Sequence, residues 1–109
     1  MYHGESQLRK GVVELAVLAV ISGGETYGYQ IVERLRLVEG LGFTESTVYP
    51  VLTRLAREGA LTVRSEASPS GPPRRYYRLS GAGEKRFRTL AEGWRTLSES
   101  LTHLVEGAT

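Results

Sequence analysis

Residues 46–59 read Ser-Thr-Val-Tyr-Pro-Val-Leu-Thr-Arg-Leu-Ala-Arg-Glu-Gly, and the interpretation of the whole chain starts from this stretch. Its apolar side chains recur at helical spacing and form one inward stripe: Val48, Val51, Leu52 and Leu55. Thr44 is a candidate N-cap, Glu45 is favourably placed for the helix dipole, and Gly59 lies where a C-terminal cap is expected. We therefore predict a helix here, although Pro50 near its second turn either restricts the helix start or kinks it.

Two further helices are expected before this one. Residues 7–22 have apolar side chains that leave little polar face toward the end of the segment, which predicts a helix buried in the core and ended by the glycine pair at 23–24. The next helix begins near Thr26, a candidate N-cap, and ends at Gly40 and Gly42. Its apolar residues have helical spacing: Tyr29, Ile31, Val32, Leu35 and Val38. Since only a short glycine-containing link separates it from the third helix, the pair has the arrangement of a helix-turn-helix.

A β-hairpin is expected after the third helix. Two short runs, residues 61–65 and 75–79, flank residues 66–73, which contain three of the four prolines of the chain. This composition predicts a hairpin with a long, stiffened tip. Tyr76 and Tyr77 favour a strand on the return, with one ring packed inward and the other outward.

The last segment predicts one long helix that pairs with a second copy of the chain. Ser80 is the candidate N-cap of a helix over residues 81–105. Its apolar side chains are spaced 3, 4, 3, 4 and 3 residues apart, the heptad pattern of a narrow seam: Phe87, Leu90, Trp94, Leu97, Leu101 and Leu104. At ~1.5 Å per residue this helix is too long to bury its whole stripe against its own domain. We expect a homodimer through this seam; the alternative is a helix folded back over its own domain.

The order of these elements defines the fold class. Three helices, two strands and a final helix predict a mainly α protein with a small β-hairpin. The architecture is a winged helix-turn-helix DNA-binding domain over residues 1–80 plus a long C-terminal dimerisation helix over residues 81–109, in one structural unit.

Positive charge is concentrated in the middle of the chain. Residues 54–95 carry ten basic and four acidic side chains, whereas residues 1–53 and 96–109 are each net −2. Twelve of the fourteen cations are arginine, which suits bidentate contacts to phosphate and guanine. A charge run is often only a solvated face, so these arginines indicate DNA binding only if they lie on the elements that would contact DNA.

Enzymatic chemistry has no support in the composition. Cysteine and aspartate are absent, and the two histidines, His3 and His103, lie near opposite ends of the chain without a carboxylate pattern beside them. No phosphate loop or nucleophile elbow occurs. Residues 1–10 lack a signal-peptide core, and the longest apolar run, residues 12–21, contains Glu14 and is too short to span a bilayer. We expect a cytoplasmic protein that is not an enzyme, needs no cofactor or metal and does not bind membranes.

The third helix of a winged helix-turn-helix enters the major groove of DNA with its N-terminal residues toward the base edges. Ser46, Thr47 and Tyr49 hold those positions, and their hydroxyl, methyl and ring groups suit bases or phosphates. Arg54 and Arg57 follow along the same helix and are expected to reach the phosphate backbone. For Tyr49, packing in the core near the helix start is an open alternative.

The hairpin is the second expected DNA contact. Arg74 and Arg75 follow two prolines at its tip, and such a tip suits insertion into a narrow, electronegative minor groove. The alternative for this pair is a solvated loop. Winged helices also serve as protein-binding modules, so a protein–protein interaction module without DNA binding is the rival function. Arginine on both the third helix and the hairpin favours double-stranded DNA as the partner.

Three segments carry a family resemblance. They are Tyr-Gly-Tyr-Gln-Ile at 27–31, Ser-Thr-Val-Tyr-Pro-Val-Leu at 46–52 with Arg-Leu and Glu-Gly following at 54–55 and 58–59, and Gly-Pro-Pro-Arg-Arg-Tyr-Tyr-Arg-Leu-Ser at 71–80. In this order and spacing they resemble the PadR family of transcriptional regulators, named for the repressor of phenolic acid decarboxylase. The match covers about residues 8–105, and the Tyr-Pro inside the third helix is habitual in that family.

The resemblance implies a winged helix-turn-helix of the short form, with a single C-terminal dimerisation helix. Members bind palindromic operators as homodimers and usually repress. By position, Tyr27 and Gln30 fall on the helix that abuts the DNA backbone, and the hydroxyl residues at the start of the third helix fall on the recognition helix. Arg75 falls where the family's wing often has a basic residue.

Trp94 matches a tryptophan common on the last helix of the family. Some short-form members bind flat, apolar, often cationic or aromatic compounds between the two subunits, which implies Trp94 as a tentative contact for a small-molecule effector. The alternative is that Trp94 packs the dimer core. Only Glu92 and Glu99 are acidic near it, and this departure disfavours a cation-binding cavity.

Overall fold

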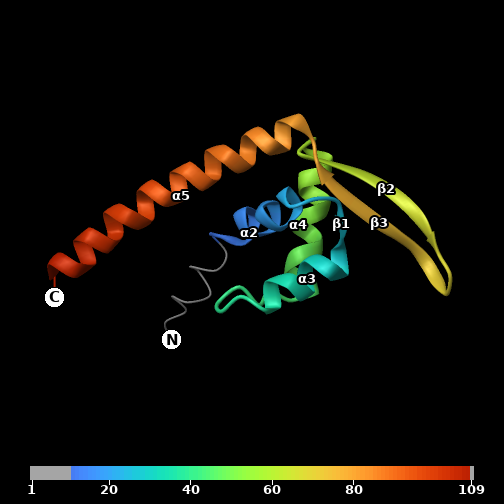
Figure 1. Cartoon of the computed structure of the whole chain (residues 1–109), viewed down its shortest axis with the longest axis horizontal. Helices are drawn as coiled ribbons and strands as arrows, with labels where there is room; N and C mark the ends of the chain where they lie inside the picture. Colours follow the sequence, from blue (N-terminus) through green and yellow to red (C-terminus); the bar gives the residue numbers. More distant parts are fainter. Residues whose placement is uncertain (1–10, 109) are drawn as a thin grey trace.

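The computed structural model describes residues 11–108, which form a body of short helices and strands from which one long helix extends (Figure 1). The helices are α2 (Val13–Ser22), α3 (Gly28–Arg36), α4 (Glu45–Arg57) and α5 (Gly81–Ala108), and the strands are β1 (Thr26–Tyr27), β2 (Leu61–Ser68) and β3 (Gly71–Leu79). This architecture confirms the predicted mainly α winged helix-turn-helix with a long C-terminal helix. The sheet differs from the expected two-stranded hairpin, because β1 adds a third strand.

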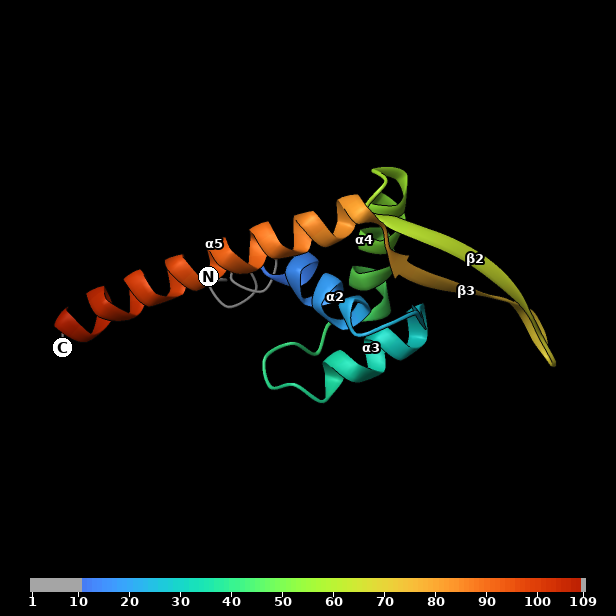
Figure 2. The ribbon, with the colours of Figure 1, turned by 45° about the horizontal axis from the view of Figure 1, so that its top comes forward.

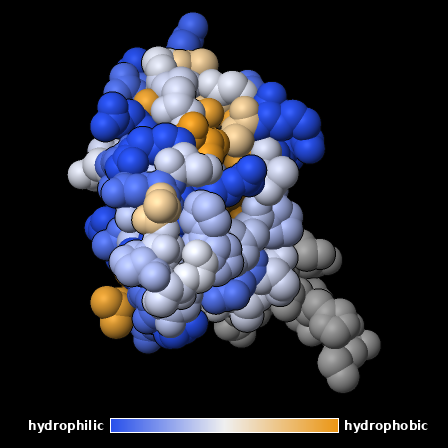
Figure 3. Space-filling view, turned by 90° about the vertical axis from the view of Figure 1, so that its right-hand side faces the viewer, coloured by the Kyte–Doolittle hydropathy of each residue, from blue (hydrophilic) through white to orange (hydrophobic). Residues whose placement is uncertain are grey.

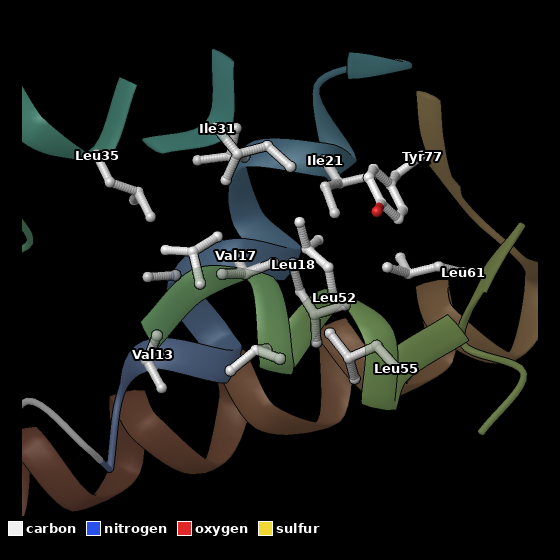
Figure 4. Close-up of a cluster of buried hydrophobic side chains, with 14 of the residues drawn as sticks. Val13, Val17, Leu18, Ile21, Ile31, Leu35, Leu52, Leu55, Leu61 and Tyr77 are labelled. Carbon is white, nitrogen blue, oxygen red and sulfur yellow. The ribbon is translucent and has the colours of Figure 1, made fainter. Parts of the chain in front are cut away.

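Helix α2 is the centre of the core and contacts α3, α4, α5 and β3 (Figure 2). The predicted stripe of α4 is buried against it: Val48, Val51, Leu52 and Leu55. Figure 4 shows side chains of α2, α3 and α4 meeting in this cluster, with Leu61 and Tyr77 closing it from the sheet. Each buried aliphatic side chain contributes about 1.5–3 kcal/mol, so the stripe decides which face of α4 remains outside.

Helix starts differ from the expectation at two places. Helix α2 begins at Val13, whereas the predicted helix began at residue 7; residues 7–10 lie outside the described part of the chain. Helix α3 begins at Gly28 rather than near Thr26, because Thr26 pairs with Tyr77 and is extended backbone in β1. Helix α3 also ends at Arg36, so Val38 lies beyond it and is half exposed.

Helix α4 runs without interruption across Pro50. Thr44 is the N-cap residue, as predicted, but its hydroxyl contacts Ser46 Oγ at 2.9 Å instead of a backbone N–H. Its carbonyl accepts the first helical bonds, from the N–H groups of Thr47 and Val48 at 3.0 Å each. Gly59 follows the helix with a φ of 81°, a left-handed conformation that glycine adopts without strain, which confirms the predicted C-terminal cap.

The hairpin of β2 and β3, here called the wing, has longer strands and a shorter turn than predicted. Strands β2 and β3 reach Ser68 and Gly71, so only residues 69 and 70 form the tip, and the predicted long tip over residues 66–73 is wrong. The register shifts between the pairs Glu66–Arg74 and Ser68–Gly71, leaving one extra residue on β3. That irregularity contains the two prolines, which lack the N–H that a regular ladder needs. The strand order is β1-β3-β2.

Helix α5 begins with the predicted cap. Ser80 Oγ accepts a hydrogen bond from the Gly83 N–H at 3.0 Å and donates to the Gly59 carbonyl at 2.6 Å. The first turns of α5 lie against α2 and β3, and the rest of the helix extends past the body of the molecule (Figure 1). Within residues 11–108, no helix combines the length and the apolar composition needed to cross a membrane.

Candidate nucleic-acid interface

The first turns of α4 present polar side chains on the face opposite the buried stripe. Ser46 and Thr47 are both exposed, as expected of residues that contact a ligand from the helix N-terminus. Gln30 is also exposed, near the start of α3, where its Oε1 accepts a hydrogen bond from the Thr26 hydroxyl at 2.5 Å. These three predicted contact residues are therefore all accessible from solvent.

Tyr49 is partly a packing residue and partly a surface residue. Its ring lies against Gly28 at the start of α3, where the Cβ of any other residue would overlap with the ring. The same side chain is 38% exposed. Partial burial, together with the charge of Glu45, raises the pKa of the Tyr49 phenol, which stays a neutral hydrogen-bond donor at physiological pH. Part of the Tyr49 ring therefore packs against α3, as the packing alternative expects, and the rest of it is accessible from solvent.

A groove of about 640 Å³ separates α4 from the wing. It is lined by residues of α3, α4 and the sheet: Tyr27, Gly28, Tyr29, Tyr49, Thr53, Pro73, Arg74, Arg75 and Tyr77. Tyr77 closes its floor because the ring is buried in the core. Seen from the wing side, the surface is mostly hydrophilic, with an apolar area in its upper part and a second one at its lower left edge (Figure 3).

Thr53 and Pro73 were not among the sequence-predicted site residues. Thr53 follows Tyr49 by four residues, so helical periodicity alone would have placed both on one face. The sequence places Pro73 in the hairpin tip. In the structure β3 already begins at Gly71, so Pro73 belongs to the strand and lines the groove.

One face of the sheet carries a row of aromatic and arginine side chains. The rings of Tyr27 and Tyr76 meet edge to face, with centroids 5.6 Å apart. The guanidinium of Arg74 lies 4.7 Å from the centre of the Tyr27 ring, and that of Arg64 lies 4.6 Å from the centre of the Tyr76 ring. Tyr27 therefore holds Arg74 in place, and stacking of this kind limits the conformations of an otherwise free side chain.

The two arginines of this row differ in their charged neighbours. Arg64 donates two hydrogen bonds to Glu25, at 2.9 and 2.7 Å, and a third to Glu66 at 2.8 Å. The bond from Arg64 is the main reason why the pKa of the Glu25 carboxyl is lowered. Arg74 has no carboxylate partner among residues 11–108. Arg64 is thus neutralised within the protein, and Arg74 is left to attract an external anion.

Arg54 lies on α4, as expected, but its guanidinium is bound by carboxylates of the same chain. Its guanidinium donates to Glu14 at 2.6 Å and to Glu58 at 3.3 Å, and only 38% of its side chain is exposed. Arg86 of α5 completes the group by donating to Glu58 at 2.8 Å. The expected phosphate contact of Arg54 is not supported by this geometry. By contrast, Arg57 is exposed and has no hydrogen-bond or ion-pair partner in the described part of the chain.

Arg75 is the second unpaired arginine at the groove. It lies on the same face of β3 as Tyr77, two residues away, and is exposed. No side chain of residues 11–108 forms an ion pair with it. Arg74 above the Tyr27 ring and Arg75 therefore leave positive charge uncompensated on the wing side of the groove, and Arg57 adds an unpaired cation on α4 outside the groove lining.

The predicted seam of α5 is largely uncovered. The exposed apolar residues of this stripe are Leu90, Trp94, Leu97, Leu101 and Leu104, and Val105 extends it. Phe87 differs from them, because it packs against the core of its own chain. A groove of about 410 Å³ lies between α5 and the start of α2, and Leu90, Trp94 and Leu97 line it together with Glu14.

Comparison with known proteins agrees with this geometry. Residues 17–89 match the model of the transcriptional regulator PadR-like family. A PadR-like transcription factor from Bacteroides fragilis is 35% identical, with 91% of this chain and 95% of that one covered and a TM-score of 0.76. A PadR family regulator from Eggerthella lenta is 30% identical over 92% of this chain and 87% of that one, with a TM-score of 0.82.

A third solved structure is Bacillus subtilis PadR in complex with operator DNA. It is 26% identical, covers 73% of this chain and 46% of its own, and has a TM-score of 0.66. The family match spans α3, α4, the wing and the first turns of α5, and so includes the elements that form the groove between α4 and the wing. The chain therefore belongs to the PadR-like family of transcriptional regulators.

Proposed function

We propose that this chain is a sequence-specific repressor that binds a palindromic operator as a homodimer. The observation that carries the proposal is the groove between α4 and the wing, which has the hydroxyls of Tyr49 and Thr53 on its helix side and the unpaired Arg74 and Arg75 on its wing side. Such a surface combines groups that read base edges with groups that bind phosphate.

Helix α4 is the recognition helix in this proposal. Ser46 and Thr47 face outward from its first turn and contact base edges in the major groove. Tyr49 places its exposed ring edge and neutral hydroxyl beside them. Arg57 lies near the C-terminal end of the same helix and binds the phosphate backbone.

The wing supplies the second contact. Arg74 and Arg75 lie on neighbouring positions of β3 and therefore on opposite faces of the strand. Arg75 faces the groove beside Tyr77, and Arg74 is held over the Tyr27 ring. Both reach DNA next to the major-groove site, where a narrow minor groove attracts arginine.

The exposed stripe of α5 is the proposed homodimer interface. An apolar row from Leu90 to Leu104 on a solvent-exposed helix face is stable when a second such row covers it. Pairing through α5 sets the two copies of α4 about 34–36 Å apart, one turn of DNA, and the operator is then an inverted repeat.

The groove beside Trp94 is the proposed site for an effector. Its lining combines the indole ring with Leu90 and Leu97, which suits a flat aromatic or apolar compound. Glu14 also lines the groove, but its carboxylate already binds Arg54, so a neutral compound fits better than a cation. Replacing Trp94 by alanine should weaken the dimer or reduce the response to such a compound. If neither dimer affinity nor response changes, the effector site lies elsewhere.

The first experiment is selection of binding sites from random duplex DNA by the purified protein at near-physiological salt. An enriched inverted repeat supports a dimeric, sequence-specific regulator and identifies its target promoters. A folded, dimeric protein that enriches no sequence would favour the rival function, a winged-helix module that binds protein instead of DNA. Placing the enriched site between a promoter and a reporter gene then tests repression.

A further inference from the structure

Four charged side chains meet where the C-terminal end of α4 lies beside the start of α5; we call this place the junction. Glu14 comes from α2, Arg54 from α4, Glu58 from the residue that caps α4, and Arg86 from the second turn of α5. We call this group the junction cluster. We propose that Arg86 and Glu58 are positioning residues that fix the angle between α4 and α5 and so determine which half-site spacing the dimer accepts. The inference rests on the proposed function, because it assumes an α5-paired dimer on an inverted repeat.

The contacts of the junction cluster connect its members in a closed network. Arg54 donates to Glu14 at 2.6 Å and to Glu58 at 3.3 Å, while Arg86 donates to Glu58 at 2.8 Å and lies 3.9 Å from Glu14. Each carboxylate therefore faces both guanidinium groups. Between 26% and 38% of each side chain is exposed, so the cluster lies at the surface of the junction, where its contribution to folding is small.

A second set of contacts, here called the clamp, joins Ser80 and Gly83 at the start of α5 to Gly59 and Ala60 just after α4. The Ser80 N–H donates to the Ala60 carbonyl at 3.0 Å, and the Ser80 hydroxyl donates to the Gly59 carbonyl at 2.6 Å. Gly83 approaches the Ala60 carbonyl so closely that a Cβ on Gly83 would overlap with it. These contacts fix one point of α5, but a helix fixed at one point is still free to rotate about it.

Arg86 provides a contact further along α5, on the side that faces α4. Phe87 beside it packs into the core and restrains the helix in another direction. Together the clamp, the junction cluster and Phe87 define the direction of α5 relative to the recognition helix. Since α5 is about 42 Å long, a rotation of about 5° at its base moves its far end by about 4 Å. That displacement is comparable to one base-pair step of about 3.4 Å.

The test compares operators of different spacing. The full chain is titrated with the palindrome that the wild-type protein enriches, and with the same palindrome carrying one base pair more or one fewer at its centre. The measured quantity is the ratio of the affinities for the selected and the altered spacing. Arg86→Met removes the guanidinium but keeps an unbranched side chain over the same surface.

Arg88→Met is the matched control. Arg88 lies on the same helix, is exposed and has no ion-pair partner among residues 11–108, so its loss changes the net charge equally without touching the cluster. We expect Arg88→Met to keep the wild-type ratio and Arg86→Met to lower it by roughly two- to thirtyfold, the range typical of coupling residues. Arg86→Lys should restore part of the ratio, because an ammonium group also binds Glu58.

Each outcome decides the question. A folded, dimeric Arg86→Met protein with the same ratio as Arg88→Met would overturn the role of the junction cluster while leaving the proposed function intact. A wild-type protein without any spacing preference would overturn the proposed function and this inference with it. If Arg86→Met does not fold, Glu58→Gln provides the same comparison, because it removes the acceptor charge at constant side-chain size.

Discussion

The junction of α4 with α5 and the groove between α4 and the wing both contain arginine, but only the junction supplies carboxylates for it. Arg54 and Arg86 share Glu14 and Glu58, whereas Arg74 and Arg75 have no ion-pair partner within the described residues. The same residue type therefore holds helices together in one region and remains available to an external anion in the other. The position of glutamate in space, rather than the number of arginines, separates the two roles.

The largest expected effect is on the junction. Gly83→Ala places a Cβ against the Ala60 carbonyl, a backbone atom that cannot swing aside, so we expect a loss of about 1–3 kcal/mol in the free energy of unfolding. Urea denaturation measures it. Gly107→Ala is the control, because a Cβ there meets no atom within 4 Å. Equal stability of the two variants would show that α5 is not clamped at Ala60.

The next effect concerns the groove. Arg75→Ala should weaken binding to operator and unrelated duplex alike, roughly tenfold, the loss of one charge-assisted contact. The slope of log affinity against log salt should fall by about 1. Thr47→Ala, on the exposed face of α4 that we propose contacts base edges, should instead change the preferred sequence. A change of preference at a single base pair caused by Arg75→Ala would contradict the phosphate role of the wing.

Two arginines one helical turn apart give the sharpest comparison. Arg57→Met should lower DNA affinity roughly fivefold and reduce the salt slope, because it removes an unpaired cation. Arg54→Met should leave the salt slope unchanged, since that charge is already compensated by Glu14 and Glu58. Binding titrations at several salt concentrations measure both variants. The same decrease in slope for both variants would show that pairing with Glu14 and Glu58 does not keep Arg54 from binding DNA.

The smallest expected effect is a pH dependence of the junction. The hydrogen bond from Arg86 is the main cause of the lowered pKa of the Glu58 carboxyl. A lowered pKa means that the folded state favours the ionised form, so this stabilisation is present above the ordinary glutamate value of 4.5 and disappears as the pH falls below it. The stability difference between wild type and Glu58→Gln should therefore be present at neutral pH and shrink below pH 4.5. If the stability difference between wild type and Glu58→Gln instead grew as the pH fell, the ionised form of Glu58 would not be the one that stabilises the folded state.

Local signals explain what could be predicted from the sequence. The stripe of α4, the glycine after it and the Ser80 cap depend on residues within a few positions of one another, and all three agree with the structure. Strand β1 was missed because two residues show no periodicity; Thr26 and Tyr27 are extended only because Tyr77 and Tyr76 lie beside them.

Arg54 shows why the candidate site was harder to predict than the fold. Its place on α4, the proposed recognition helix, suggested a phosphate contact, but its partner Glu14 is 40 residues away in the chain. No pattern within the helix indicates that contact. The prolines of the wing gave a wrong prediction because their local signal was too strong. Proline favours loops, but these prolines lie in a strand, at an irregularity of the pairing where no N–H is needed.

The order of the sheet has a further consequence for solubility. Strand β2 is at the edge, and a long exposed edge strand is a template on which another chain can add a strand and aggregate. Arg64 and Glu66 place opposite charges along that edge, and the irregular pairing opposite Glu66 prevents a flat, regular hairpin. Two hairpins of this kind are poor templates for each other. The wing can therefore be long enough for the DNA contact proposed above without becoming a starting point for aggregation.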